Sequence, residues 1–354
     1  MFLAWKEMRY EKLRYTLIIA MIVLISYLIF ILTSLAQGLA RQNTDAIKSW
    51  DIQSVVLNDN ANTSMTQSII TKSQLASIKN NKKMAIVTQV PVVVRGDGNR
   101  KISAQFVGIN NKQFIMKNLK ITDGKKPIKA NEIVVDSALK QSGYQIGDKI
   151  KLNSGKTDYV ISGFVNNAKL NISPVIYGSN KVAKLLKNAG VTFAASAVVS
   201  QDGKVKFSNN SGLKNYTVEQ FIKKLPGYSA QTTTFVFMIG FLMIISLVVV
   251  AVFLYILTMQ KLENYAVLRA QGVPVGILVR ATISQSLLIV ISGLIIGTIF
   301  TGVTASFIPA AVPMYFSVPL LSTVAVGLVV VALLGVIIPI RIVTRVDPVT
   351  VIGG

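Results

Sequence analysis

The sequence lacks the side chains on which most enzyme chemistry depends. Its 354 residues include no cysteine and no histidine. Disulfides, thiolate or imidazole metal ligands, and nucleophiles paired with a histidine base are therefore excluded. No carboxylate pair or nucleophile–base set stands out in the long polar segment that follows residue 35. The composition argues against a zinc enzyme or a Ser-His-Asp hydrolase, and we expect no intrinsic cofactor and no catalytic residue.

One stretch, the GKT at 155–157, partly matches the pattern of a phosphate-binding loop. The nucleotide-binding pattern G-x-x-x-x-G-K-S/T needs a glycine five residues before Gly155, and that position is Ile150. The surrounding NSGK (153–156) is instead a good hairpin turn between IKL and TDYVISGFV. We interpret the stretch as a turn, so the chain has no nucleotide site of its own.

One short polar stretch, NYAVLRAQGVP at 264–274, interrupts two long apolar runs. Leu262, Ala266 and Ala270 recur at i, i+4 and i+8, while Lys261 and Arg269 lie off that stripe, which predicts an amphipathic helix.

A glycine and a proline end this predicted helix. Gly272 suits the left-handed position after a helix, and Pro274 cannot continue that helix but can begin the next one. A capped connection explains both residues. It does not explain why a connection that could be far shorter contains a helix.

The elements that position this stretch are membrane spans. The chain is 51% hydrophobic with a mean hydropathy of +0.54, which is too apolar for an ordinary soluble domain. The run Thr16–Leu35 has no charge, and as a helix it matches a hydrocarbon core about 30 Å thick. A signal peptide is the alternative, but AQGLA (36–40) is a weak cleavage site, so an uncleaved helix is favoured. We predict transmembrane helices at 16–37, 231–258, 277–308 and 320–341.

Basic residues near the span ends predict the orientation. They cluster in three pieces, which are an amphipathic N-terminus (1–15), the connection 259–276 and the tail 342–354. With four spans all three fall on one side, the cytoplasm, so both termini are cytoplasmic in a multi-pass protein of the cell membrane. The uncharged loop 309–319 and the large segment 38–230 then lie outside.

The outside segment is predicted to be a mixed α/β domain. Apolar runs predict strands at 54–57, 84–94, 102–109, 132–136, 159–165, 174–178 and 195–199. Thr71 with Gln74, and Thr217 with Gln220, have capping-box spacing at two helix starts. The predicted cytoplasmic pieces, together with Arg280 and Arg341 at the span ends beside them, hold nine of the 37 Lys and Arg, so the outside segment holds 28. That charge could attract anionic headgroups or wall polymers, or it could simply be a solvated surface. Nucleic acid is a poor partner for such a domain.

Four stretches resemble one family, the MacB/FtsX-like permeases of ABC transporters. They are ENYAVLRAQGVPVGILVR (263–280) before a glycine-rich span, SGYQIGDKIKL (142–152), the YVISGFV that follows it, and RVDPVTVIGG (345–354). The resemblance implies four transmembrane α-helices, with an α/β extracytoplasmic domain inserted between helices 1 and 2. It also implies that the connecting helix docks on a separate ATP-hydrolysing subunit, two copies of which would serve a homodimer of this chain. The docking residues would be Glu263, Ala266, Leu268, Arg269 and Gly272.

Within the family the likeness is greatest to haem-efflux permeases of Gram-positive bacteria. The shared stretches are MFLAWKEMRYEKLRYTLI (1–18), TSLAQGLARQN (33–43) and VDPVTVIGG (346–354). Arg41 is followed by Gln42, where such relatives often have an acidic residue, so no carboxylate role at that position is carried over.

The expected function is export of an amphiphile, with haem as the substrate by resemblance alone. The outer halves of the first two spans gather an apolar set on which haem could stack, namely Tyr27, Phe30, Phe235, Phe237, Met238 and Phe241. Met238 is the best-placed iron ligand in a chain without His or Cys, but helix packing and lipid contact are the more common roles of Met and Phe and are favoured here.

Interfacial anchors are expected at Trp50, Tyr177, Tyr228 and Tyr315, near the outer boundary. Gly293 and Gly297 in the third predicted span form a small-xxx-small face for close helix contact, a pattern that is also common by chance.

Two other functions stay open. One is a non-transporting regulator of a cell-wall hydrolase, and the other is an exporter of peptides, lipids or lipoproteins.

Overall fold

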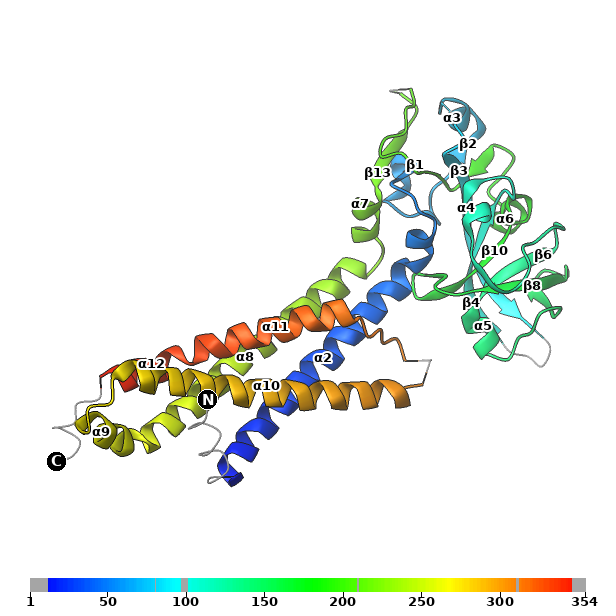
Figure 1. The fold of residues 1–354 in the computed structure, drawn as a ribbon. Helices are drawn as coiled ribbons and strands as arrows, with labels where there is room; N and C mark the ends of the chain where they lie inside the picture. Colours follow the sequence, from blue (N-terminus) through cyan, green and yellow to red (C-terminus); the bar gives the residue numbers. More distant parts are fainter. Residues whose placement is uncertain (1–11, 80, 97–100, 209, 310–311, 346–354) are drawn as a thin grey trace. The chain divides into compact units, whose positions relative to one another are not determined.

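The chain divides into two compact units, each described by itself (Figure 1). The computed structural model describes residues 12–79, 81–96, 101–208, 210–309 and 312–345. The helical unit comprises Met1–Gly38 with Thr232–Gly354, and the sheet unit comprises Leu39–Gln231. The predicted N-terminal segment up to residue 11 and the VDPVTVIGG tail lie outside the described residues.

Four helical stretches in the described chain are long and apolar enough to cross a membrane. Their helices are α2 (Lys12–Ser49), α8 (Tyr228–Gln260), α10 (Val275–Phe307) and α11 with α12 (Val318–Gly335 and Ile337–Thr344). The fourth predicted span is therefore two helices. Pro339 explains the break, because proline lacks an N–H and its ring clashes with the carbonyl four residues earlier, which is that of Gly335.

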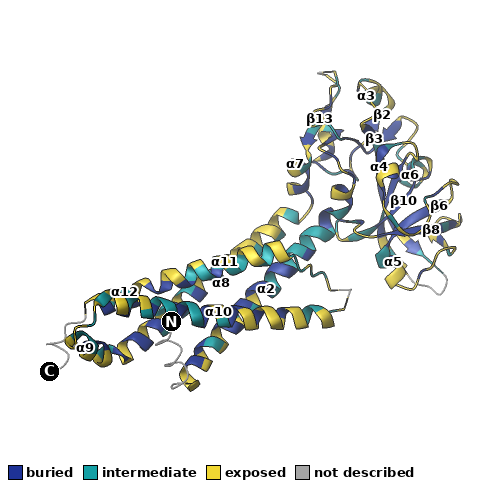
Figure 2. Ribbon diagram, viewed as in Figure 1, coloured by how far each residue is buried: buried dark blue, intermediate teal, exposed yellow. Residues whose placement is uncertain are grey.

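The long helices bury one side and expose apolar residues on the other. Their shared core includes Ile29, Val250, Ile289 and Ala332, from four different helices. The outward faces are coloured as exposed along much of their length in Figure 2, and they carry large side chains such as Phe241 at 62% exposure. Because exposed apolar surface on this scale is unfavourable in water, these faces belong in lipid or against another chain.

The sheet unit is built on one large mixed sheet with two parallel pairs, β4 with β10 and β6 with β8. Strand β7 (Lys149–Leu152) also pairs with β3 and β8, β9 (Lys169–Leu170) pairs with β10, and β2 (Ile70–Thr71) forms a separate pair with β11 (Phe193–Ala195). The main order is β13 (Leu213–Thr217), β1 (Ser54–Asn58), β12 (Ala197–Ser200), β3 (Met84–Arg95), β4 (Lys101–Ile109), β10 (Ser173–Ser179), β6 (Glu132–Asp136), β8 (Tyr159–Val165) and β5 (Ile121–Gly124).

Both faces of this sheet are covered. Along β4, Ala104 and Phe106 enter one core while Val107 and Ile109 enter the other, as the alternation of a strand requires. Helices α5 (Ser137–Gln141) and α6 (Asn180–Lys187) supply the first core, and α4 (Phe114–Asn118) and α7 (Val218–Lys223) supply the second. Burial on two sides explains the nearly continuous apolar runs of the strands.

The local predictions for this unit largely hold. Both capping boxes are present, at Thr71 before α3 (Lys72–Ala76) and at Thr217 before α7. The predicted strand 195–199 is interrupted at Ser196, whose N–H donates to the Val87 carbonyl at 2.9 Å and whose hydroxyl accepts from the Gln89 N–H at 3.2 Å.

Candidate functional site

Helix α9 (Leu262–Ala270) follows α8 directly and ends in a Schellman motif. The N–H of Gly272 donates to the Arg269 carbonyl at 2.9 Å, and the N–H of Val273 donates to the Leu268 carbonyl at 3.1 Å. Gly272 has φ +91°, a left-handed conformation that favours glycine. Val273 and Leu268 join one apolar cluster, which is the hydrophobic contact typical of this cap. The predicted C-terminal glycine is confirmed, and Pro274 precedes α10 as its N-cap.

The packed face of α9 differs from the predicted apolar stripe. Tyr265 (4% exposed) and Ala266 (0%) are buried, whereas Ala270 is exposed. Tyr265 packs with Leu278 of α10 and Val343 of α12. A tyrosine that the sequence analysis did not single out therefore holds α9 against two other helices, because its ring offers more apolar surface than an alanine.

The opposite face of α9 is open. Its exposed residues recur at helical spacing, and they are Glu263, Asn264, Val267, Ala270 and Gln271. Of the five expected docking residues, Glu263 and Gly272 are exposed, Leu268 and Arg269 are half-buried, and Ala266 is enclosed. Ala266 thus lies in the packing of α9 and not on its open face.

A buried polar cluster lies where α8 passes into α9. The ammonium of Lys261, 8% exposed, donates to the Tyr15 hydroxyl of α2 at 3.0 Å and to Gln285 Oε1 of α10 at 3.3 Å. Gln285 Nε2 also donates to the Tyr15 hydroxyl, and the ammonium lies 5.7 Å from the centre of the Tyr15 ring. Hydrogen bonds and a cation–π contact offset the cost of burying this charge. Sequence reasoning missed the cluster, because its members are far apart in the chain.

Helices α10 and α2 approach closely at two glycines. A Cβ on Gly293 would lie 2.5 Å from Ile22 Cγ2, and one on Gly297 would lie 2.3 Å from Ser26 Oγ. The small-xxx-small pattern at 293–297 is therefore a real helix contact.

The predicted substrate residues do not share one environment. Phe30 (2% exposed) lies in the core of the helical unit, and the Tyr27 hydroxyl bonds to Thr304 Oγ1 of α10 at 2.9 Å. Phe235 is half-buried, while Met238 (42%) and Phe241 (62%) are exposed on α8.

Two aromatic residues expected at the membrane surface are internal instead. The Trp50 Nε1–H donates to the Tyr177 hydroxyl at 3.0 Å, and both side chains are buried in the sheet unit. Burial raises the pKa of Tyr177 to about 12. The prediction that Trp50 and Tyr177 are interfacial anchors is wrong, because an aromatic ring with a polar tip also suits a core that supplies a partner. Tyr228 packs against this core, and Tyr315 is 43% exposed.

The GKT stretch is a turn. The Gly155 N–H donates to the Leu152 carbonyl at 3.1 Å, and Asn153 adopts φ 52° beside it. The turn joins β7 to β8, as the sequence predicts, although β7 pairs with β8 only at Lys149 and Ile150 and then pairs with β3 at Lys151 and Leu152. In the part of the chain that is described, no cluster of three or more Asp and Glu side chains could hold a metal ion.

Two family models together match most of the chain. Residues 16–206 match the MacB-like periplasmic core domain, and residues 236–348 match the FtsX-like permease C-terminal domain. The first covers α2 and most of the sheet unit, and the second covers most of α8 and α9 to α12.

Curated relatives match over their full length. A protein of Staphylococcus haemolyticus (strain JCSC1435) named hemin transport system permease protein HrtB is 26% identical over 99% of both chains. A protein of the same name from Staphylococcus epidermidis (strain ATCC 12228 / FDA PCI 1200) is also 26% identical over 99% of both. An ABC transporter permease of Mycobacterium tuberculosis (strain ATCC 25618 / H37Rv) is 21% identical over 100% of this chain and 99% of its own.

Solved structures resemble the sheet unit only distantly. The periplasmic region of MacB from Actinobacillus actinomycetemcomitans covers 49% of this chain and 92% of its own, with 15% identity and a TM-score of 0.35. The extracellular domain of the transporter YknZ from Gram-positive bacteria covers 45% and 84%, with 14% identity and a TM-score of 0.30. At these scores the likeness adds nothing to the assignment, which rests on the family models. With four apolar helical stretches and an α/β domain between the first and second, the chain belongs to the MacB/FtsX-like family of ABC-transporter permeases.

Proposed function

We propose that this permease is the transmembrane subunit of an ABC exporter driven by ATP hydrolysis in a separate subunit. The observation that carries the proposal is α9, a capped helix with one face packed on α10 and α12 and the other face open. On the open face Val267 is 46% exposed between Glu263, Asn264 and Gln271. An apolar residue ringed by polar ones on a firmly held helix suits a protein interface.

The buried face of α9 supplies a route for mechanical coupling. Tyr265 links α9 to α10 and α12, and Lys261 links the start of α9 to α2 and α10. If α9 moved while α2, α10 and α12 stayed in place, the buried charged cluster would break, and breaking such a cluster is costly. A displacement of α9 would therefore move these three helices as well. Closure of the ATPase subunits would move α9, and the long helices would carry that motion outward.

The assembly that follows is a homodimer of this chain with two ATPase subunits. The connection at 259–276 and both termini would be cytoplasmic, and the sheet unit would be extracytoplasmic. This orientation rests on the basic residues at the span ends.

Haem is the substrate that we propose. Full-length relatives at 26% identity carry the name of a hemin transport system permease. On α8, Phe237 (63% exposed), Met238 and Phe241 lie within one turn and offer an open apolar face with one thioether, a known type of haem ligand. Tyr27 and Phe235 would border this face, and Phe30 would reach it only when the helices part.

The docking test uses the permease co-expressed and co-purified with its ABC-type ATPase subunit. Val267→Glu with Glu263→Arg should abolish co-purification and coupled ATP hydrolysis, because both residues are on the open face of α9. Arg341→Glu, an exposed charge reversal on α12, is the matched control and should retain both. Unchanged assembly of the double variant would overturn the docking surface.

The substrate test uses the same complex in proteoliposomes. Haemin should stimulate ATP hydrolysis, and Phe241→Ala combined with Met238→Ala should raise the haemin concentration that gives half-maximal stimulation about tenfold, since an aromatic contact and a ligand to haem together contribute about 1.4 kcal/mol to binding. Phe300→Ala is the control, because Phe300 is a similarly exposed phenylalanine (54%) on α10. An equal response to haemin in both variants would remove Met238 and Phe241 from the substrate site, whereas stimulation by peptide but not by haemin would remove haem as the substrate.

A further inference from the structure

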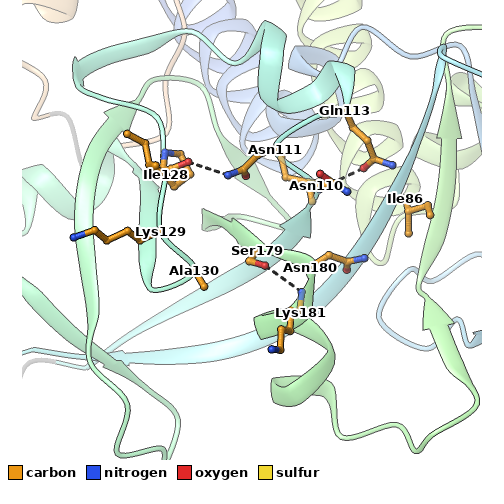
Figure 3. Close-up of a pocket in the computed structure, with 12 residues that line it drawn as sticks. Ile86, Asn110, Asn111, Gln113, Ile128, Lys129, Ala130, Ser179, Asn180 and Lys181 are labelled. Carbon is orange, nitrogen blue, oxygen red and sulfur yellow. Dashed lines mark hydrogen bonds between the residues drawn. The ribbon is translucent and has the colours of Figure 1, made fainter.

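A pocket of about 420 Å³ lies in the sheet unit at the edge where the parallel strands β4 and β10 end (Figure 3). Strand β4 ends at Ile109 and is followed by the loop 110–113 and α4, and α6 begins at Asn180 directly after β10. The carboxyl ends of neighbouring parallel strands, where helices begin, are the usual ligand-binding edge of an α/β sheet.

The loop before α4 presents two hydrogen-bond donors to this pocket. The Lys112 N–H donates to Asn110 Oδ1 at 3.0 Å, and the Asn110 N–H donates to Gln113 Oε1 at 3.3 Å. Because a backbone N–H can only donate, the side-chain amide oxygens of Asn110 and Gln113 face the loop. Their NH₂ groups therefore remain available as hydrogen-bond donors. Within the described residues, neither NH₂ group has a protein acceptor.

The side-chain amides of Asn111 and Asn180 each have an oxygen that is not used as an acceptor. Asn111 Nδ2 donates to the Pro127 carbonyl at 3.0 Å, so its Oδ1 is turned away from that bond. Asn180 Oδ1 is buried and has no hydrogen-bond partner, which is unfavourable unless a ligand or water supplies one. Gly108 allows this arrangement, since a Cβ there would lie 3.0 Å from Asn180 Cα and 2.2 Å from Ala183 Cβ.

The charge around the pocket is positive. Lys129 and Lys181 line its rim, with ammonium groups on flexible exposed stems that point outward in Figure 3. A second pocket of about 560 Å³ shares Gln113 and adds Lys82, Lys112 and Lys117. Among the described residues, neither lining includes Asp or Glu.

The carboxylate of Glu132, beside the lining residues Ile128 and Lys129, already accepts hydrogen bonds. Glu132 Oε2 accepts from the N–H groups of Ile128 at 2.7 Å and Lys129 at 3.1 Å. These backbone hydrogen bonds hold the pKa of Glu132 below its usual value, so it stays ionised and does not donate to the pocket.

We propose that these two pockets, which share Gln113 in their linings, bind an anionic sugar through its hydroxyl groups and its phosphate or carboxylate. Hydroxyls both donate and accept, which matches the paired amide donors and acceptors, and the exposed lysines around the rim supply a positive field that attracts the anion. A peptide strand fits less well, because the pockets lie at strand ends and not along a free sheet edge. This site is distinct from the proposed haem face and does not depend on it.

The test is calorimetric titration of the full-length permease in a neutral detergent. The probes are N-acetylglucosamine 1-phosphate, N-acetylglucosamine, inorganic phosphate and triglutamate. The sugar phosphate should bind at least about tenfold more tightly than the other three, because only it offers both hydroxyls and charge. No binding of the sugar phosphate at about 10 mM, or equal binding by phosphate or triglutamate, would overturn the proposal.

The decisive variant is Gln113→Glu, which keeps the oxygen that accepts from Asn110 but replaces the free NH₂ donor by a negative oxygen. It should weaken binding of the sugar phosphate at least about tenfold, whereas Gln145→Glu, an equal charge change outside both pockets, should not. Trp50 fluorescence in a Trp5→Phe background reports whether the sheet unit is folded. If Gln113→Glu does not fold, Lys181→Gln against the control Lys149→Gln serves instead, and equal affinities in that pair would sink the proposal.

Discussion

Lys187, in the last turn of α6, is a half-buried cation held by oxygen atoms. Its ammonium donates to Ser196 Oγ at 2.7 Å and to the carbonyls of Thr66 at 2.9 Å, Ser68 at 3.2 Å and Met65 at 3.5 Å. It also lies 5.2 Å from the centre of the Phe193 ring. Burial lowers its pKa to about 8 from 10.5. One side chain thus ties α6 to the loop 65–68 and to the residue that separates β11 from β12.

This shift predicts a pH dependence. The folded chain releases the Lys187 proton near pH 8 and the unfolded chain near 10.5, so the unfolded state binds more protons between these values. The contribution of Lys187 to the free energy of unfolding should therefore rise with pH across that window and be absent in Lys187→Met. Urea unfolding can be followed by Trp50 fluorescence in a Trp5→Phe background, with wild type and variant compared at pH 7.5 and pH 9.5. Parallel changes in the two proteins would contradict this prediction.

At the scale of elements, the helical unit depends on a few close contacts between long helices. The contact of α10 with α2 at Gly293 leaves no room for a methyl group beside Ile22. In lipid the hydrophobic effect does not favour association of apolar helices, because lipid tails are as apolar as the helices. Close packing therefore supplies much of the free energy of helix association.

Gly293→Ala should therefore lower the stability of the helical unit by about 1–3 kcal/mol, the usual cost of overpacking. Combining it with Ile22→Ala, which removes the clashing Cγ2, should cost less than the sum of the two single changes. Gly302→Ala is the control on the same helix, since nothing lies within 4 Å of a Cβ there. Thermal unfolding in detergent, followed by circular dichroism, measures all four variants, and additive effects would refute the contact.

For the whole molecule, the orientation in the membrane determines whether α9 can meet a cytosolic ATPase. Asn264 is exposed on α9, and Lys125 is exposed on the sheet unit next to β5. The proposed function requires these two residues on opposite sides of the membrane.

The absence of native cysteine makes this directly measurable. A membrane-impermeant maleimide should label Lys125→Cys in intact cells and Asn264→Cys only after the cells are opened, because the reagent cannot cross the bilayer. The unmodified chain, which cannot react, is the control. Labelling of Asn264→Cys in intact cells would place α9 outside and refute the coupling scheme.

The sequence by itself determined the features that depend on local pattern. Charge-free runs of helical length, the Gly272 cap, the two capping boxes and apolar strand runs such as 102–109 follow from neighbouring residues, and all are present. Tertiary structure alone decided which residues meet across the chain. It joined Lys261 to Tyr15 and Gln285, drew Trp50 and Tyr177 into a core, and buried Tyr265 against α10 and α12 while leaving Ala270 of the predicted stripe exposed. The local sequence pattern shows at what spacing the residues of an element are buried. Which residues a buried side chain contacts depends on packing between segments up to 270 residues apart.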